Sequence, residues 1–180
     1  MNVGEEIVAV YLQFIRGCEF TQTNLYHPDV QGEIDVVGIN LTPNELYVCE
    51  VAIHLETGLK YVKKNNQPDN VDRLVSKFSK DIKYANQYFP DYEKHFMFWS
   101  PIVKNTPTAK HDQMKDIKEI QAKIKEQYSI EIDMVINERF LSCIKELRNY
   151  AGKQTKELKS PILRLMQIEE YSVKTYGNER

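Results

Sequence analysis

Apolar residues in the first part of the chain recur at the spacing of an amphipathic helix. Val8, Leu12 and Ile15 lie three or four residues apart, which predicts a helix over about residues 4–15. Glu5 stands near the start of this helix on its apolar face, where a fully solvated acid has no reason to be. The helix macrodipole also favours an acid at this end, so a site role and a structural role are both open to Glu5.

The next apolar segments alternate at strand spacing. A short strand is expected at about residues 19–23, and longer strands over 32–39 and 46–54. Thr42-Pro43-Asn44 between the two longer strands has turn chemistry. These two strands therefore form a β-hairpin.

Beyond residue 55 a polar loop leads into alternating helices and strands. The apolar positions predict helices at about 71–89, 110–127, 138–150 and 161–176, and strands at about 95–103 and 130–136. The order α, β, β, β, α, β, α, β, α, α is typical of an α/β domain with a mixed β-sheet. We expect one domain over residues 1–180, with a core over about 1–136 and a C-terminal helical extension over about 137–176.

Composition narrows the class of protein. Hydrophobic residues make up 42% and charged residues 28% of the 180 residues, which is typical of a folded domain. No apolar run approaches the roughly 18–20 residues of a membrane span, and the N-terminus opens with Glu5 and Glu6 rather than a basic stretch followed by an apolar one. The three cysteines have no CxxC spacing, which disfavours a disulfide framework and a structural zinc site. We therefore expect a cytoplasmic protein without a membrane span.

Two carboxylates of the predicted hairpin are the first candidates for chemistry. If the turn is Leu41–Asn44, then Ile39 pairs with Leu46 and Asp35 lies directly opposite Glu50. Side chains opposite each other in an antiparallel pair are about 4.5–5.5 Å apart at Cβ. Two such carboxylates repel each other, so a neutralising group is required if the sheet is buried.

A divalent cation is one such group, because one or two carboxylates with water and phosphate oxygens commonly hold Mg²⁺. A shared proton, which raises the pKa of one carboxyl group, is the alternative. The hairpin could also face solvent, and a register slip of one residue would separate Asp35 from Glu50. The hairpin alone leaves these interpretations open.

Longer motifs favour the interpretation that a divalent cation neutralises the two carboxylates. They are GEEIVAVYL at residues 4–12, Gly17 after the helix, QGEIDVVGI at residues 31–39 and LYVCEVA at residues 46–52. Over residues 4–54 the chain resembles the PD-(D/E)XK nuclease superfamily, and within it the Holliday-junction-resolvase-like and YraN-type proteins. Such proteins begin with a Gly-Glu helix ending in Tyr-Leu and continue with GEID and a strand that reads VEVK.

This resemblance implies a restriction-endonuclease-like αβββαβ core with a mixed sheet and additional C-terminal helices. It implies that Asp35 and Glu50 bind the metal and that Glu5 assists in positioning metal or substrate. The implied activity is that of a Mg²⁺- or Mn²⁺-dependent endodeoxyribonuclease, in which the metal activates water and neutralises the phosphate. The expected partner is DNA.

Ala52 departs from the family pattern, because the family has lysine two residues after the second acid. That lysine would steady the attacking water or the developing charge on phosphorus. Three residues could substitute for it. His54 is next on the same predicted strand face, Lys77 flanks the apolar face of the 71–89 helix, where some superfamily members carry a migrated lysine, and Glu33 faces Ala52 in the proposed register. A packed histidine, a solvated lysine and an ordinary surface acid are the corresponding structural interpretations.

A local basic patch is the candidate contact for nucleic acid, because the net charge of −2 and the pI near 6.1 do not favour nucleic-acid binding by the whole molecule. Lys60, Lys63 and Lys64 directly follow the proposed catalytic strand. Further basic residues and an aromatic residue follow or interleave with them, namely Tyr61, Arg73, Lys77 and Lys80. Phosphate contact and simple solvation are equally open for this group.

Three functions therefore remain. The preferred one is a metal-dependent deoxyribonuclease in restriction, phage defence, mobile-element processing or repair. The second is a catalytically degenerate protein of the same fold that binds nucleic acid or a protein, which Ala52 and the mild acidity favour. The third is an interaction protein that forms a homodimer through its C-terminal helices, with Leu141, Ile144, Leu147, Leu163, Leu165 and Met166 as the dimer face.

Overall fold

In the part of the chain that the structure describes, ten helices and strands follow one another in the order that the sequence predicts. The computed structural model describes the chain except for residues 1, 28–31, 109–111 and 178–180. Within the described residues the elements are α1 Val3–Phe14, β1 Phe20–His27, β2 Gly32–Asn40, β3 Glu45–Val51, α2 Asn70–Tyr88, β4 Glu93–Ser100, α3 Gln113–Tyr128, β5 Asp133–Ile136, α4 Glu138–Lys153 and α5 Pro161–Tyr176.

The strands form one mixed five-stranded sheet in the spatial order β1-β2-β3-β4-β5. β1, β2 and β3 are an antiparallel meander, whereas β4 and β5 run parallel to β3. In the hairpin of β2 and β3, Ile39 pairs with Leu46 and Val36 pairs with Cys49, so the predicted register is confirmed. The α/β class and the mixed sheet are confirmed with it.

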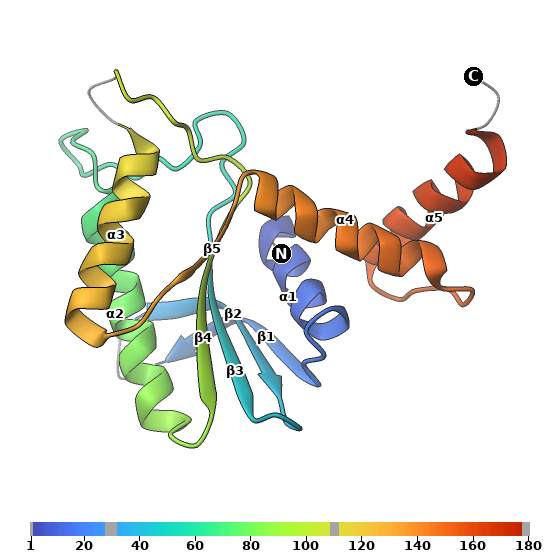
Figure 1. Cartoon of the computed structure of the whole chain (residues 1–180), viewed down its shortest axis with the longest axis horizontal. Coiled ribbons are helices and arrows are strands. Elements are labelled where there is room, and N and C mark those ends of the chain that lie inside the picture. Colours follow the sequence, from blue (N-terminus) through green and yellow to red (C-terminus); the bar gives the residue numbers. More distant parts are fainter. Residues whose placement is uncertain (1, 28–31, 109–111, 178–180) are drawn as a thin grey trace.

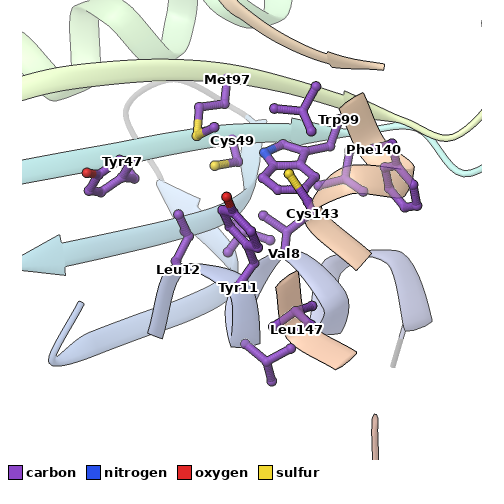
Figure 2. Close-up of a cluster of buried hydrophobic side chains, with 14 of the residues drawn as sticks. Val8, Tyr11, Leu12, Tyr47, Cys49, Met97, Trp99, Phe140, Cys143 and Leu147 are labelled. Atoms are coloured by element: carbon purple, nitrogen blue, oxygen red, sulfur yellow. The ribbon is translucent and has the colours of Figure 1, made fainter. Parts of the chain in front are cut away.

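Helices cover both faces of the sheet (Figure 1). α1 and α4 pack on one face, where Tyr11 meets Trp99 edge-to-face with ring centroids 5.1 Å apart and Phe140 lies 6.1 Å from the same tryptophan ring (Figure 2). α2 and α3 pack on the other face around Phe78 and Ile120, which are fully buried. Both faces of the central strands are therefore buried, so a charged side chain there needs a partner.

Several boundaries differ from those expected. β3 ends at Val51 rather than at residue 54, because the chain turns over His54–Gly58, where Gly58 has a φ of +65° and its N–H bonds the His54 carbonyl. β1 is longer than expected and pairs along β2 as far as His27 with Gly32. The expected start of the 110–127 helix lies partly outside the described residues.

The C-terminal helices pack against the rest of the chain along one face only. Leu147, Leu163 and Met166, which were expected at a dimer face, are buried in the same cluster as Trp99. Leu141 and Leu165 remain exposed on α4 and α5. A homodimer therefore stays a prediction, with fewer of the expected residues available to form it. No helix in the described ranges combines the length and apolar character needed to cross a membrane.

The crossing of α1 over β2 depends on Gly38. A Cβ atom at this position would lie 2.9 Å from Leu12 Cδ1 and 3.0 Å from Cys18 Sγ. We expect Gly38→Ala to lower the free energy of unfolding by about 1–3 kcal/mol, because extra volume in a packed core forces neighbours from their positions. Urea denaturation measures the change. The cost should shrink in a Leu12→Ala background, and equal costs in both backgrounds would contradict the steric explanation.

Candidate functional site

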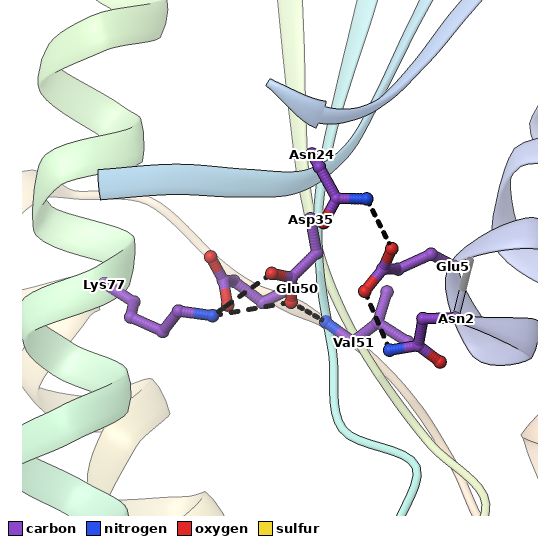
Figure 3. A network of polar contacts seen from close by, with 7 residues as sticks. All are labelled: Asn2, Glu5, Asn24, Asp35, Glu50, Val51 and Lys77. Carbon is purple, nitrogen blue, oxygen red and sulfur yellow. Dashed lines mark hydrogen bonds and ion pairs between the residues drawn. The ribbon is translucent and has the colours of Figure 1, made fainter. Parts of the chain in front are cut away.

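Three charged side chains meet on the α2 side of the sheet. Glu50 on β3 is 1% exposed and Asp35 on β2 is 7% exposed. Lys77 reaches them from α2, with its Nζ 3.3 Å from Asp35 Oδ1 and 3.4 Å from Asp35 Oδ2, and it also donates a hydrogen bond to Glu50 Oε2 (Figure 3). The two acids of the hairpin are therefore brought together, and a lysine neutralises part of their charge. We refer to Asp35, Glu50 and Lys77 as the charge cluster.

Local structure explains how each member is positioned. The paired residues of β2 and β3 extend as far as Val36 and Cys49, and one residue further on Asp35 Oδ2 accepts the Val51 N–H at 2.7 Å. The Asp35 carboxylate thus replaces a main-chain acceptor at the end of the hairpin and is fixed by this bond. Glu50 follows Cys49 on β3, and the pairing of β3 with β4 holds its main chain in place.

Lys77 owes its position to the amphipathic pattern of α2. Leu74, Phe78 and Ile82 recur at helical spacing and are buried against the sheet. Lys77 precedes Phe78, so it stands at the edge of the buried face, and its side chain is only 31% exposed. The aliphatic part of a lysine can lie along apolar surface while the ammonium group reaches a polar partner. Here that partner is inside the protein.

Asp81 is a fourth member of the site that the sequence interpretation missed. It lies one helical turn after Lys77 on α2, is 4% exposed and is close enough to Glu50 for its charge to raise the pKa of the Glu50 carboxyl group. Glu50 Oε1 and Asp81 Oδ2 are buried atoms that have no hydrogen-bond partner among the described residues. The sequence signal that could have identified Asp81 is the presence of an acid on the apolar face of a helix, beside Phe78 and Ile82.

The environment favours the protonated forms of Glu50 and Asp81. Burial raises the pKa of Glu50 well above its usual range, and the nearby Asp81 and Asp35 carboxyl groups raise it further, while Lys77 opposes them. Burial also raises the pKa of Asp81 to about 7. Burial alone would lower the pKa of Lys77, but Glu50 and Asp35 outweigh it and the pKa is raised. Lys77 is therefore an ammonium ion at neutral pH.

Glu5 lies on the other side of β3 from Lys77 (Figure 3). Its two carboxylate oxygens accept hydrogen bonds from Asn2 Nδ2 and Asn24 Nδ2, each at 2.7 Å. Asn24 can present its amide in this direction because it interrupts β1 with a φ of +51°. Glu5 is thus buried and accepts hydrogen bonds from neutral amides. It makes no direct contact with Asp35 or Glu50 in the described structure, so its role in metal binding stays a prediction.

The other expected substitutes for the missing lysine are placed differently. Ala52 is buried in the apolar cluster under α2, and its N–H bonds the Trp99 carbonyl. The expectation that His54 continues the strand face of Glu50 is wrong, because β3 ends before it, and its ring packs edge-on against Tyr61 at 5.8 Å. Glu33 is exposed at the start of β2. Of the three candidates, Lys77 alone contacts Asp35 and Glu50.

The loop lysines expected to bind nucleic acid fall into two groups. Lys63 forms ion pairs with Asp72 at 2.9 Å and Asp69 at 3.6 Å, so it has a structural partner at the start of α2. Lys60 and Lys64 are exposed on the loop.

A different set of basic residues lines a cavity next to the charge cluster. The cavity has a volume of about 260 Å³ and lies between the start of β2 and the exposed side of α2. We call it the α2 cavity, and its walls are Gly32, Glu33, Ile34, Arg73, Lys77, Lys80, Asp81 and Tyr84. Lys77 and Asp81 belong both to its wall and to the buried site, so the cavity gives access to the charged groups.

Comparisons with known proteins give no family assignment, so the assignment of function depends on the residues of the site. No model of a protein family matches the sequence, and no curated protein matches it significantly. In the part of the chain that the structure describes, no group of three or more His, Cys, Asp or Glu side chains is arranged to hold a metal ion. Two carboxylates, Asp35 and Glu50, remain the candidate ligand pair.

Asp81 should make the stability of the metal-free protein fall as pH rises. Its pKa is raised from the usual 3.8 to about 7 in the folded state, so its stabilising contribution is complete below pH 3.8 and disappears as pH rises through 7. We expect the melting temperature measured in EDTA to decrease less between pH 5 and about 7.5 in Asp81→Asn than in the wild type.

Asp91→Asn is the matched control, because Asp91 is an exposed acid in the turn before β4 and should keep the wild-type pH dependence. The same pH slope in Asp81→Asn and the wild type would show that Asp81 ionises as an ordinary acid.

Proposed function

We propose that this protein is a metal-dependent nuclease that hydrolyses DNA phosphodiester bonds with a restriction-endonuclease-like core. The order α1-β1-β2-β3-α2-β4, with an antiparallel meander followed by a helical crossover to a parallel strand, supports this proposal. It is the αβββαβ order that the resemblance over residues 4–54 implies. Fold alone does not define an activity, so the argument depends on the site.

One observation carries the proposal: the ammonium group of Lys77 contacts both Asp35 and Glu50. Ala52 removes the lysine that the family pattern places on the strand, and Lys77 supplies one from α2 instead. A lysine among two buried acids on adjacent strands is the combination that phosphodiester hydrolysis requires of this kind of site. The proposal therefore assigns Asp35, Glu50 and Lys77 to catalysis.

The acids are suitable ligands for a divalent cation. Glu50 Oε1 is buried without a hydrogen-bond partner, so this atom has a lone pair directed at no donor among the described residues. Asp35 and Glu50 would hold Mg²⁺ or Mn²⁺, with water and phosphate oxygens as the remaining ligands. When bound, such a cation supplies Lewis acidity toward the phosphate and lowers the pKa of a coordinated water.

Lys77 acts as a cation and donor rather than as a base. Glu50 and Asp35 raise its pKa, so it keeps its proton at neutral pH. An ammonium group next to the carboxylates stabilises negative charge that develops on a phosphate oxygen, and it orients a water by donating a hydrogen bond. Its long stem along α2 fixes the direction from which it approaches.

A binding protein without catalysis is the second candidate. Lys77 already neutralises part of the charge on Asp35 and Glu50, and no third acidic, histidine or cysteine ligand in the described structure completes a metal site. A protein with this arrangement can remain folded without a cation. Titration with Mn²⁺, followed by calorimetry, separates the two candidates because only the nuclease requires the cation.

Plasmid cleavage in Mg²⁺ or Mn²⁺ tests the nuclease directly. We expect Asp35→Asn and Glu50→Gln to abolish cleavage, and Lys77→Met to reduce the rate about 10²–10³-fold, the usual loss when a charge-stabilising donor is removed. Lys145→Met is the matched control, since Lys145 is exposed on α4, which covers the opposite face of the sheet. It should cleave like the wild type.

Folding of each variant is checked by circular dichroism and thermal denaturation, because removing one partner of a buried ion pair commonly costs about 3–5 kcal/mol. Cleavage by folded Asp35→Asn at the wild-type rate would refute the assignment of the site. A wild type that cleaves neither duplex, branched nor single-stranded DNA with either cation would refute the nuclease.

A further inference from the structure

α2 carries two exposed basic residues, Arg73 and Lys80, that the charge cluster does not use. Arg73, Lys77 and Lys80 follow one another at helical spacings of four and three residues and line the α2 cavity together. Lys77 is directed inward to Asp35 and Glu50. Arg73 and Lys80 form no ion pair within the described ranges of the chain, so their charges are available to a ligand.

Arg73 is held ready for such a ligand. Its guanidinium group lies 4.9 Å from the centre of the Tyr61 ring, and this cation–π contact fixes the group without using its N–H donors. The nearest acids at the start of α2, Asp69 and Asp72, are paired with Lys63. Lys63 therefore neutralises part of the negative charge that Asp69 and Asp72 place near Arg73.

β2 forms the wall that faces these basic residues, and an aromatic ring lies next to them on α2 itself. Gly32, Glu33 and Ile34 belong to the β2 wall. Tyr84 lies one helical turn after Lys80, and its ring packs beside Tyr88 with centroids 4.8 Å apart, which steadies it. Cationic groups beside an aromatic ring are the combination with which proteins bind single-stranded nucleic acid, the phosphates on the cations and the base on the ring.

Dimensions favour a single strand over a duplex. The volume of about 260 Å³ is below the usual range for ligand pockets, about 300–1,000 Å³, and suits one nucleotide rather than a base pair. Arg73 and Lys80 are separated by seven residues, or about 10 Å along the helix axis. A nucleotide between them would lie beside Lys77, which contacts the buried acids.

We propose that Arg73, Lys80 and Tyr84 form a subsite that holds one nucleotide of a single strand next to the charge cluster. The inference rests on the proposed function in taking a nucleic acid as the ligand. It goes beyond the proposed function by specifying that the nucleic acid is single-stranded and by naming the residues that bind the nucleotide. Lys60, Lys63 and Lys64 are not part of this subsite.

Binding without metal tests the subsite independently of cleavage. A fluorescein-labelled single strand of about 12 nucleotides, within the usual site size of such proteins, is titrated in EDTA, alongside a blunt hairpin duplex of the same sequence. We expect the wild type to bind the single strand at least about tenfold more tightly, in line with an aromatic stacking platform. Arg73→Ala and Lys80→Ala should each weaken binding several-fold and reduce the salt slope of log K by about 0.7, the value for one phosphate contact with a single strand.

Matched variants separate local contacts from general charge and from unfolding. Lys145→Ala removes one positive charge from α4 and should bind like the wild type, with an unchanged salt slope. Tyr84→Leu should weaken single-strand binding about fivefold or more, whereas Tyr84→Phe keeps the ring and the affinity. Thermal denaturation confirms that each variant is folded.

The outcomes of this experiment and of the cleavage experiment are distinguishable. Equal affinities of Arg73→Ala, Lys80→Ala and Lys145→Ala would overturn the subsite even if the wild type cleaves DNA. Equal or tighter binding of the duplex would overturn it as well. Arg73- and Lys80-dependent binding of the single strand supports the subsite, and it does so even if no cleavage is observed.

Discussion

The contact of one ammonium group with two buried carboxylates constrains the rest of the structure. Moving an ion from water into a protein costs several kcal/mol even after relaxation, and the cost is recovered only when a partner is close and well oriented. Asp35 and Glu50 lie on adjacent strands between two helical layers, where water cannot solvate them fully. Lys77 is the only basic side chain that contacts them among the described residues, so α2 must dock in a position that brings it there.

Asp35 takes part both in the charge cluster and in the main-chain hydrogen bonding of the hairpin. Its Oδ2 receives the Val51 N–H at the point where the paired residues of β2 and β3 end, and both of its oxygens face Lys77. The same carboxylate therefore completes main-chain hydrogen bonding and takes part in the charge cluster. A neutral isostere preserves the first role better than alanine does, because an amide oxygen still accepts the N–H. Loss of activity in an alanine variant alone would not separate the two roles.

Sequence patterns predicted the parts of this arrangement that depend on local chemistry. Alternation along residues 32–39 and 46–54, with the turn at Thr42-Pro43-Asn44, was sufficient for the register that places Asp35 near Glu50. The order of helices and strands followed from their periodicity. Asp81 was missed because its proximity to Glu50 depends on how α2 docks on the sheet, which no local pattern contains. His54 was misplaced because the turn that ends at Gly58 stops β3 early. The ion pairs of Lys63 with Asp69 and Asp72 were not predicted, because they depend on how the loop folds back on the start of α2.

The two sides of α2 explain how a chain with a net charge of −2 can present a surface suited to a polyanion. Asp81 is directed into the protein, where burial raises its pKa to about 7, so it carries less negative charge near neutral pH than an exposed acid. Arg73 and Lys80 stay on the outer side without ion-pair partners in the described structure, while Lys63 neutralises Asp72. Local potential depends on which charges are paired or suppressed, and the formal sum over the sequence counts all of them equally. A mildly acidic composition is therefore compatible with the basic α2 cavity beside the buried acids.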